Sequence, residues 1–271
     1  MQRLVNRIQP EAETRAVTEA ARELGYTSVN FDLIYGLPRQ TLASIERSIE
    51  STLRLRPDRI ALYSLAVVPW IKPAQRLFKD EDLPPPPEKR ALYELARGAL
   101  LAGGYREIGM DHFALPGDGL ARAQAKGSLH RNFMGYADLR TDVLLGLGVS
   151  SISEAPGAFH QNEKVLPLWE RKIGEGRLPT LRGHKHTAED RRQREKILRF
   201  MTRGEIALDV DEQRDAREFL ASMLGDGLVT IEGGTLRLTT EGRPFLRNAC
   251  AFFDLRLRRA QPAGSLFSKS I

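Results

Sequence analysis

Apolar residues recur along the first part of the chain with two different periods. Segments in which they lie three to four positions apart predict amphipathic helices, and shorter apolar runs between them predict strands. The predicted helices cover residues 10–24, 41–55 and 87–103, and the predicted strands cover residues 27–34, 60–68 and 106–110. Strands and helices alternating at this spacing favour a parallel sheet of βαβ units, either doubly wound or part of a β/α barrel.

The first predicted helix and strand each have an apolar side that should be buried. The helix aligns apolar side chains between Val17 and Leu24, and the strand turns Phe31 and Leu33 to one face. Asp32 points to the other face and ends this strand. Ligands of α/β folds collect at the carboxyl ends of parallel strands. We therefore expect one rim to hold Asp32, Tyr35, the backbone around Ala66 and the segment after Met110.

Residues 115–182 show no regular apolar period. Glycine and proline are scattered through them, and Gly146 and Gly148 interrupt an apolar run. Glycine in such a run lets the backbone approach a ligand or another element closely, and tight packing is the commoner use. We predict loops around one short strand or helix, packed over the rim. The polar segment that follows carries His184 and His186, which we expect to face solvent.

After residue 187 the chain becomes strongly charged and helical. Periodicity predicts helices over 188–201 and 211–224, a hairpin over 228–238 and a final helix over 240–259. This order resembles a winged helix, and a basic winged helix could bind nucleic-acid phosphates. Acidic residues lie near the basic ones, however, and no helix is rich in side chains that read bases. We favour a packing domain with no nucleic-acid partner.

The composition is that of a soluble globular protein, with 41% hydrophobic and 28% charged residues. Lys and Arg number 41 against 35 Asp and Glu, and the net charge of +6 fits either simple solubility or an anionic ligand. We find neither a run of about 20 apolar residues nor an export leader. We therefore expect no membrane partner and a cytoplasmic location. The one cysteine, Cys250, is predicted to be a buried, inert thiol.

Two short segments, Ile108–Ala114 and His130–Tyr136, concentrate side chains suited to chemistry. His112 and His130 can relay protons near neutral pH, and Arg131 can bind a carboxylate as a bidentate fork. The alternative is that both histidines are structural, hydrogen-bonded residues, which is the commoner case for an isolated histidine. They lie eighteen positions apart without helical pairing, so we predict no metal site.

These two segments, read together with Asn30–Pro38, resemble the oxygen-independent coproporphyrinogen III oxidases, which are radical S-adenosylmethionine enzymes of haem synthesis. The resemblance extends over essentially the whole chain, from Leu4–Arg7 to Arg247–Asp254. It implies a partial β/α barrel followed by a mainly helical C-terminal domain. It also implies two oxidative decarboxylations that convert coproporphyrinogen III to protoporphyrinogen IX, through a 5′-deoxyadenosyl radical released from S-adenosylmethionine by a [4Fe–4S] cluster.

The resemblance implies roles for individual residues. Arg7 and Asp32 match positions that contact S-adenosylmethionine, Ala66 matches a backbone contact to it, and Ile152 lines the site of one of the two molecules that the family binds. Taken alone, Asp32 could accept ribose hydroxyls, pair with a cation or cap a helix. The residues expected near the carboxylates of the porphyrinogen are His112, His130 and Arg131.

The cluster of this family is held by a Cys-x-x-x-Cys-x-Cys motif that precedes the region present here, and Cys250 matches none of its ligands. We therefore expect a C-terminal portion of the enzyme, monomeric and inactive alone, with coproporphyrinogen III and an electron donor as partners. The alternative is a tetrapyrrole- or partner-binding fragment without catalysis. The predicted parts are a partial barrel over 1–114, covering loops and a linker over 115–186, a helical domain over 187–262 and a tail over 263–271.

Overall fold

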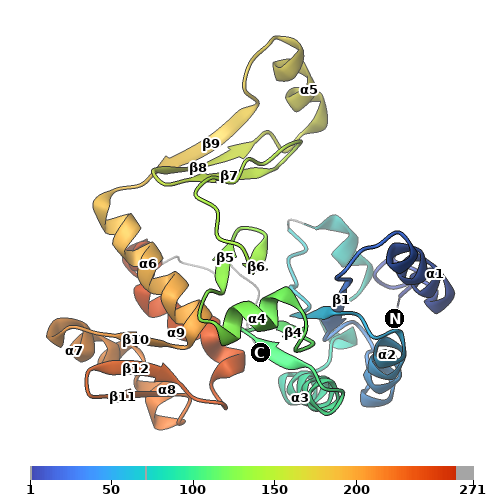
Figure 1. The fold of residues 1–271 in the computed structure, drawn as a ribbon, viewed down its shortest axis with the longest axis horizontal. Helices are drawn as coiled ribbons and strands as arrows, with labels where there is room; N and C mark the ends of the chain where they lie inside the picture. Colours follow the sequence, from blue (N-terminus) through green and yellow to red (C-terminus); the bar gives the residue numbers. More distant parts are fainter. Residues whose placement is uncertain (1, 71, 261–271) are drawn as a thin grey trace.

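A computed structural model of the chain describes residues 2–70 and 72–260, so the predicted tail at 263–271 lies outside the described residues. The chain is a mixed α/β protein in which three parts follow one another (Figure 1). We call residues 2–137 the body, residues 152–185 the arm and residues 188–260 the C-terminal domain. None of the described helices is long and apolar enough to cross a membrane.

The body contains a four-stranded sheet in the order β1-β2-β4-β3. Its strands are β1 (Asn30–Tyr35), β2 (Arg59–Ser64), β3 (Arg106–Ile108) and β4 (His112–Ala114). β1 and β2 are parallel, as predicted, but β4 lies between β2 and β3 and runs antiparallel to both. The prediction of a wholly parallel sheet is therefore wrong. The chain reverses at residues 109–111 instead of crossing over through a helix, and a tight reversal always gives an antiparallel pair.

Two helices cover one face of this sheet. They are α2 (Leu42–Leu55) and α3 (Pro86–Ala102), both close to their predicted positions. Thr41 begins α2 by accepting a hydrogen bond from the backbone of Ser44, and α3 begins with prolines, which suit a first helical turn. The fully buried core between helices and sheet includes Ile49, Ile60, Leu92, Leu100 and Phe113. Phe31 and Leu33 join this core, so the remaining face of β1 is free to carry polar side chains.

α1 (Glu11–Glu23) forms where predicted but does not bury the predicted side. Val17 is 71% exposed and Leu24 is 79% exposed. The contacts that attach the helix are polar. Arg22 donates to the backbone oxygens of Leu55 and Arg56 at the end of α2, and Thr18, the buried residue of α1, donates to a backbone oxygen within the helix. The apolar period therefore predicted the helix correctly and its buried side wrongly.

The region predicted as loops contains much more regular structure. The body helix α4 (Gly119–Ala125) is followed by a hairpin of β5 (His130–Asn132) and β6 (Gly135–Ala137). The arm then consists of β7 (Ile152–Ala155), β8 (Ala158–Asn162), α5 (Leu166–Gly174) and β9 (Thr180–Lys185). β7, β8 and β9 form an antiparallel sheet that projects from the rest of the molecule with α5 at its far end (Figure 1). β5, β6 and β7 have only three or four residues each, which are too few to show a clear period in the sequence.

The C-terminal domain follows the predicted order with two corrections. The elements are α6 (Ala188–Arg203), β10 (Glu205–Ala207), α7 (Val210–Phe219), α8 (Ala221–Gly225), β11 (Val229–Glu232) and β12 (Thr235–Leu238). The predicted hairpin is present as β11 and β12, and β10 adds a third strand. The helix predicted over 211–224 is interrupted at Leu220, which turns into the core and is 1% exposed.

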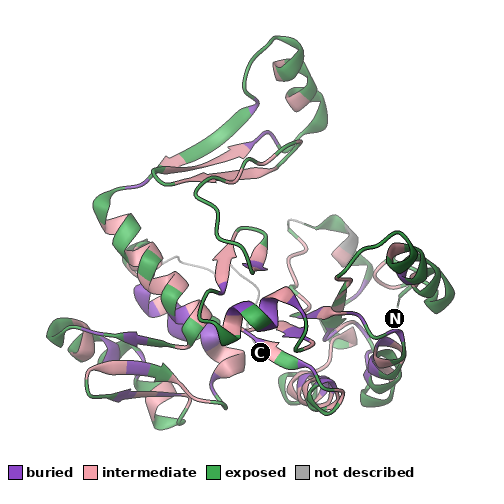
Figure 2. Ribbon diagram, viewed as in Figure 1, coloured by how far each residue is buried: buried purple, intermediate pink, exposed green. Residues whose placement is uncertain are grey.

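The single final helix predicted over 240–259 is also wrong. The segment forms short pieces: η3 (Arg243–Phe245), α9 (Leu246–Cys250), η4 (Ala251–Phe253) and α10 (Leu255–Ala260). Pro244 is tolerated only in a first turn, so no helix can continue through it. Phe252 and Phe253 are both buried in the core. Figure 2 shows the buried residues gathered in this domain and beneath the body sheet, whereas the arm is mostly half-buried or exposed.

The arm joins the C-terminal domain through Asp190, in the first turn of α6. Its carboxylate accepts hydrogen bonds from the backbone and side chain of Thr187, from Arg256 and from His184. His186 is 8% exposed and packs edge-on against Phe159 of β8, with ring centroids 4.2 Å apart. The prediction of solvent exposure is therefore wrong for His186, whereas the side chain of His184 is 39% exposed although it contacts Asp190.

Asp190→Ala is expected to loosen this junction. Arg256, followed by Thr187, holds the pKa of Asp190 far below its usual range. A lowered pKa gives stability at every pH above the usual Asp range and loses it only in strong acid. Hydrogen exchange at residues 184–187 should therefore be faster in the variant at both pH 7 and pH 5. Asp211→Ala, which removes an exposed carboxylate from the first turn of α7, is the control. Equal exchange in the two variants would show that the junction does not depend on Asp190.

Candidate functional site

The body sheet has a second face, turned away from α2 and α3. Cross-strand pairing places Asp32 of β1 opposite Ala61 of β2, and Ala61 opposite His112 of β4. The next pair on the same face is Ile34 with Tyr63. Side chains at paired positions project to the same side of a sheet. One face therefore combines a carboxylate, a phenol and an imidazole.

Asp32 was predicted to end β1, but it is the third residue of this strand. It is exposed, and its carboxylate accepts one hydrogen bond, from Asn30 Nδ2 at 2.8 Å. Among the described residues Asp32 makes no ion pair and caps no helix, so the two alternatives for this residue find no support. Its remaining lone pairs are free to accept hydroxyl groups of a ligand, as the prediction requires.

His112 is held on three sides. Nδ1 lies 2.6 Å from Asp111 Oδ1, and the rings of Tyr63 and Tyr136 meet the imidazole edge-on, with centroids 6.1 and 5.5 Å away. The backbone oxygen of Asp111 accepts a hydrogen bond from Leu62 N at 2.7 Å, which ties the β3–β4 turn to β2. The histidine side chain is 11% exposed and Asp111 is 19% exposed, so the pair is largely shielded from water.

Arg131 approaches the same group from the β5–β6 hairpin. It lies opposite Tyr136, and its guanidinium carbon is 4.7 Å from the centre of that ring. Its Nη1 atom is buried without a hydrogen-bond partner among the described residues. A buried charged donor without a partner is costly. This donor is therefore held within the chain, by the ring of Tyr136, and does not face solvent.

Tyr136 connects these groups to the C-terminal domain. Its hydroxyl donates to the backbone oxygen of Met201 in α6 at 3.1 Å, and burial raises the pKa of this phenol well above its usual range. The ring fits against the β3–β4 turn because Gly109 has no side chain there. Sequence reasoning paired Asp111 with His112 but gave it no role, and it did not select Tyr63 or Tyr136, although Tyr136 lies inside the second motif.

His130 is separated from this group. It alternates with Arg131 along β5 and therefore points to the other side of the hairpin. Burial, and then the nearby charges of Arg140 and Arg194, lower the pKa of His130. The structure thus brings His112 and Arg131 together around Tyr136, and places His130 among cations that would favour its neutral form.

The chain is similar in sequence to known proteins over its whole length. The chain is 40% identical over 282 residues to the oxygen-independent coproporphyrinogen III oxidase of Thermostichus vulcanus, covering 100% of this chain and 86% of the relative. The chain belongs to the oxygen-independent coproporphyrinogen III oxidase family. No family model matches it. The family predicted from the two motifs is confirmed.

Other members of the family are considerably longer than this chain. The oxidase of Paracoccus denitrificans is 41% identical over 94% of this chain, and that of Escherichia coli is 39% identical over 96%. The chain spans 58% and 59% of the length of these two relatives. The solved structure of the E. coli coproporphyrinogen III oxidase, described as a radical SAM enzyme, aligns with a TM-score of 0.88 at 39% identity, over 94% of this chain and 61% of that one.

The four residues that the oxidase family would use for S-adenosylmethionine are dispersed. Arg7 is exposed in the turn before α1, Ala66 follows β2, and Ile152 begins β7 of the arm. Among the described residues no hydrogen bond or ion pair joins any of them to another or to Asp32. The backbone oxygen of Ala66 accepts a hydrogen bond from Gln75 at 2.8 Å. Their cofactor roles remain predictions.

The glycines near Ile152 serve close packing. A Cβ atom at Gly146 would lie 2.6 Å from the backbone oxygen of Ile152. Asn162 donates to the backbone oxygens of Gly146 and Gly148, which fixes this loop against β8. Packing, the commoner of the two uses, thus accounts for Gly146.

The cluster of the oxidase family does not fit on the described residues. Iron–sulfur clusters are held mainly by thiolates. Cys250 is 6% exposed, and burial raises the pKa of its thiol to about 12, which keeps it protonated. The prediction that this thiol is buried is confirmed. Within residues 2–70 and 72–260, no group of three or more His, Cys, Asp or Glu side chains is placed to hold a metal ion.

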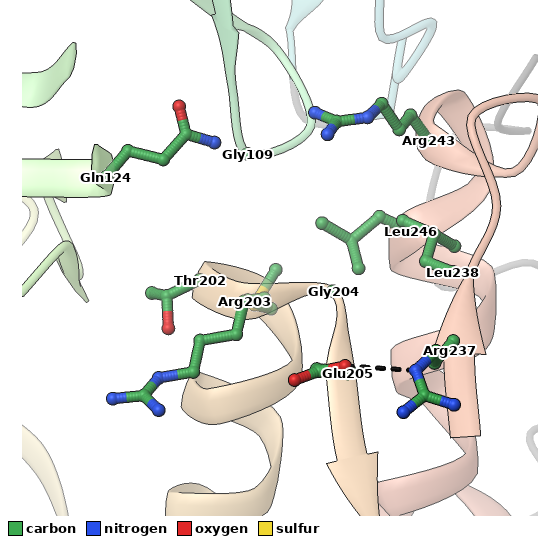
Figure 3. A pocket seen from close by; sticks show the side chains of 11 residues that line it. Gly109, Gln124, Thr202, Arg203, Gly204, Glu205, Arg237, Leu238, Arg243 and Leu246 are labelled. Carbon is green, nitrogen blue, oxygen red and sulfur yellow. Dashed lines mark hydrogen bonds and ion pairs between the residues drawn. The ribbon is translucent and has the colours of Figure 1, made fainter. Parts of the chain in front are cut away.

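A cavity of about 160 Å³ lies between the body and the C-terminal domain, beside Gly109 of the β3–β4 turn (Figure 3). Gln124 and Arg243 extend toward each other across it, and Arg237 turns aside to pair with Glu205 at 3.1 Å. This volume is small beside the roughly 300–1,000 Å³ of typical ligand pockets. None of the predicted cofactor or substrate residues lines it, so it is a packing gap between two parts.

Proposed function

We propose that the chain supplies the sheet face and the C-terminal domain of an enzyme that oxidatively decarboxylates coproporphyrinogen III to protoporphyrinogen IX. The observation that carries the proposal is the group formed by His112, Arg131 and Tyr136 beside Asp32, in a chain that matches the family along its whole length. Coproporphyrinogen III carries four carboxylates, and the guanidinium of Arg131 is a group suited to binding one of them.

S-adenosylmethionine would supply a 5′-deoxyadenosyl radical when an electron arrives from a [4Fe–4S] cluster. The part of this chemistry that belongs to the described residues is binding and orientation. Asp32 would accept the ribose hydroxyls, with Arg7, the backbone of Ala66 and Ile152 as further contacts. Arg131 would hold the carboxylate of a substrate propionate. A hydrogen atom of that propionate side chain would then face the radical.

The cysteine-bearing part must then pack against this chain. β1 stands at one end of the sheet order, so its outer edge has no strand partner among the described residues. Beside it α1 leaves Val17 and Leu24 exposed, and Ile8 and Tyr26 are each 67% exposed. An open strand edge next to exposed apolar side chains is a surface suited to further strands and helices. We assign this surface to the portion of the relatives that the chain does not span.

A complementation experiment tests the proposal. The chain alone, reduced under anaerobic conditions with S-adenosylmethionine and coproporphyrinogen III, should form no 5′-deoxyadenosine and no protoporphyrinogen IX. Adding or fusing the cysteine-bearing portion of the P. denitrificans relative should restore both products. In this assembly Asp32→Asn should weaken S-adenosylmethionine binding about tenfold, roughly the value of one charge-assisted hydrogen bond, and exposed Asp211→Asn should not. Cleavage by the chain alone, or an inactive assembly that contains a cluster, would refute the proposal.

A second candidate is tetrapyrrole binding without catalysis, to which the guanidinium of Arg131 is also suited. It predicts that the chain binds coproporphyrin III while the complemented assembly stays inactive. DNA binding is less well supported. Two of the cations at the end of the C-terminal domain, Arg256 and Arg259, are engaged in ion pairs with Asp190 and Glu189.

A further inference from the structure

We infer that Asp111 is a positioning residue for substrate binding. It fixes His112 in the tautomer that carries its proton on Nδ1, so that Nε2 faces the open side of the sheet as an acceptor for a pyrrole N–H of the tetrapyrrole. This inference rests on the proposed function and adds a residue and a contact to it.

The geometry determines the tautomer. An ionised carboxylate accepts hydrogen bonds only, so the 2.6 Å contact between Asp111 Oδ1 and His112 Nδ1 requires the proton on Nδ1. A neutral imidazole then has a lone pair on Nε2. The backbone of Asp111 is fixed beside β2, because its oxygen accepts a hydrogen bond from Leu62 in that strand. The tautomer is therefore a consequence of the turn that joins β3 to β4.

The free nitrogen is accessible. His112 Nε2 makes no hydrogen bond to any described residue, and it is not among the side-chain atoms that are sealed from solvent without a partner. His186 is the opposite case, with its Nε2 buried and unpartnered. Gly135 of the β5–β6 hairpin approaches this nitrogen without a side chain of its own, since a Cβ there would lie 3.9 Å from Nε2.

The surroundings favour a neutral N–H donor as the ligand group. Arg131 stacks on the same Tyr136 ring and already provides the cation for a carboxylate. Tyr63 and Tyr136 surround the imidazole with aromatic rings, a setting suited to the individual pyrrole rings of a ligand. A porphyrinogen offers both classes of group, with carboxylates at its periphery and pyrrole N–H donors at its centre. His112 would thus orient the ring centre while Arg131 anchors the rim.

The first test is nitrogen NMR of the chain labelled at histidine, with the His112 signals assigned by their loss in His112→Phe. Wild-type His112 should show a protonated Nδ1 and an unprotonated Nε2 above pH 8. In Asp111→Asn the side-chain amide can donate to Nδ1, so a substantial fraction should move to the Nε2-protonated tautomer. Asp111→Glu, which keeps a carboxylate, should restore the wild-type pattern. A mixed tautomer in the wild-type chain would overturn the inference.

The second test is titration with coproporphyrin III, followed by its fluorescence, in the chain and in the complemented assembly. Asp111→Asn and His112→Phe should each weaken binding about tenfold, the value of one buried hydrogen bond, and the double variant should lose no more than either. Exposed Asp142→Asn is the matched control. Failure of the wild-type assembly to bind refutes the proposed function. Normal binding that Asp111→Asn leaves unchanged refutes only the role of Asp111.

Discussion

Replacing Gly109 with alanine is expected to lower the free energy of unfolding by about 2–4 kcal/mol, the sum of overpacking and of a strained backbone. Gly109 has φ +61°, and a Cβ there would lie 1.9 Å from Cζ of Tyr136. The ring cannot retreat easily, because Tyr136 is 7% exposed and its hydroxyl is bonded to Met201. Displacing this ring removes one support of His112 and the stacking surface of Arg131. Tetrapyrrole binding should therefore fall as well.

Gly104→Ala is the matched control for this prediction. Gly104 also has a positive φ, of +88°, but a Cβ there would have no atom within 4 Å. It should therefore show the backbone cost alone, about 1 kcal/mol. Urea unfolding followed by circular dichroism gives both values, and coproporphyrin III titration gives the effect on binding. If the two variants lose equal stability, Tyr136 does not pack against the β3–β4 turn.

The spacing of apolar residues predicted the positions of the helices and strands of the body far better than it predicted which elements pack or pair with one another. The helices and the first two strands lie close to the predicted positions because each has a strong apolar period. The antiparallel pairing of β4 with β2 and β3 was not predictable in this way, since the three residues of β4 are too few to show an apolar period. The exposed side of α1 was missed for a different reason. An apolar period shows that one side of a helix is apolar, but it does not show whether another part of the chain covers that side.

The candidate site shows the same division. The two motifs suggested His112, His130 and Arg131 as substrate residues and gave no reason to separate His130 from Arg131. That separation follows from strand alternation in β5, which becomes visible only when the hairpin is known. Tyr63 is contributed by β2, far from either motif in sequence, and cross-strand register alone places it on the face of Asp32. Its selection required the tertiary structure.

Phe200→Ala is expected to lower the stability of the C-terminal domain by about 3–5 kcal/mol, as for other large-to-small changes at fully buried aromatic residues. Phe200 is 0% exposed and lies at the centre of a cluster that includes Leu220, Leu236 and Phe253. The comparison is Phe219→Ala. Phe219 is 44% exposed, so its replacement should lose about 1 kcal/mol.

Hydrogen exchange shows how far this loss spreads. The cluster around Phe200 and the core beneath the body sheet are separate. Protection in Phe200→Ala should therefore fall across residues 188–260 and persist in β1, β2, α2 and α3. The hairpin β5–β6 should be the exception in the body, because Tyr136 is bonded to Met201, the neighbour of Phe200. Loss of protection throughout the body would mean instead that the two cores unfold as one unit, and that the sheet face is not stable without the C-terminal domain.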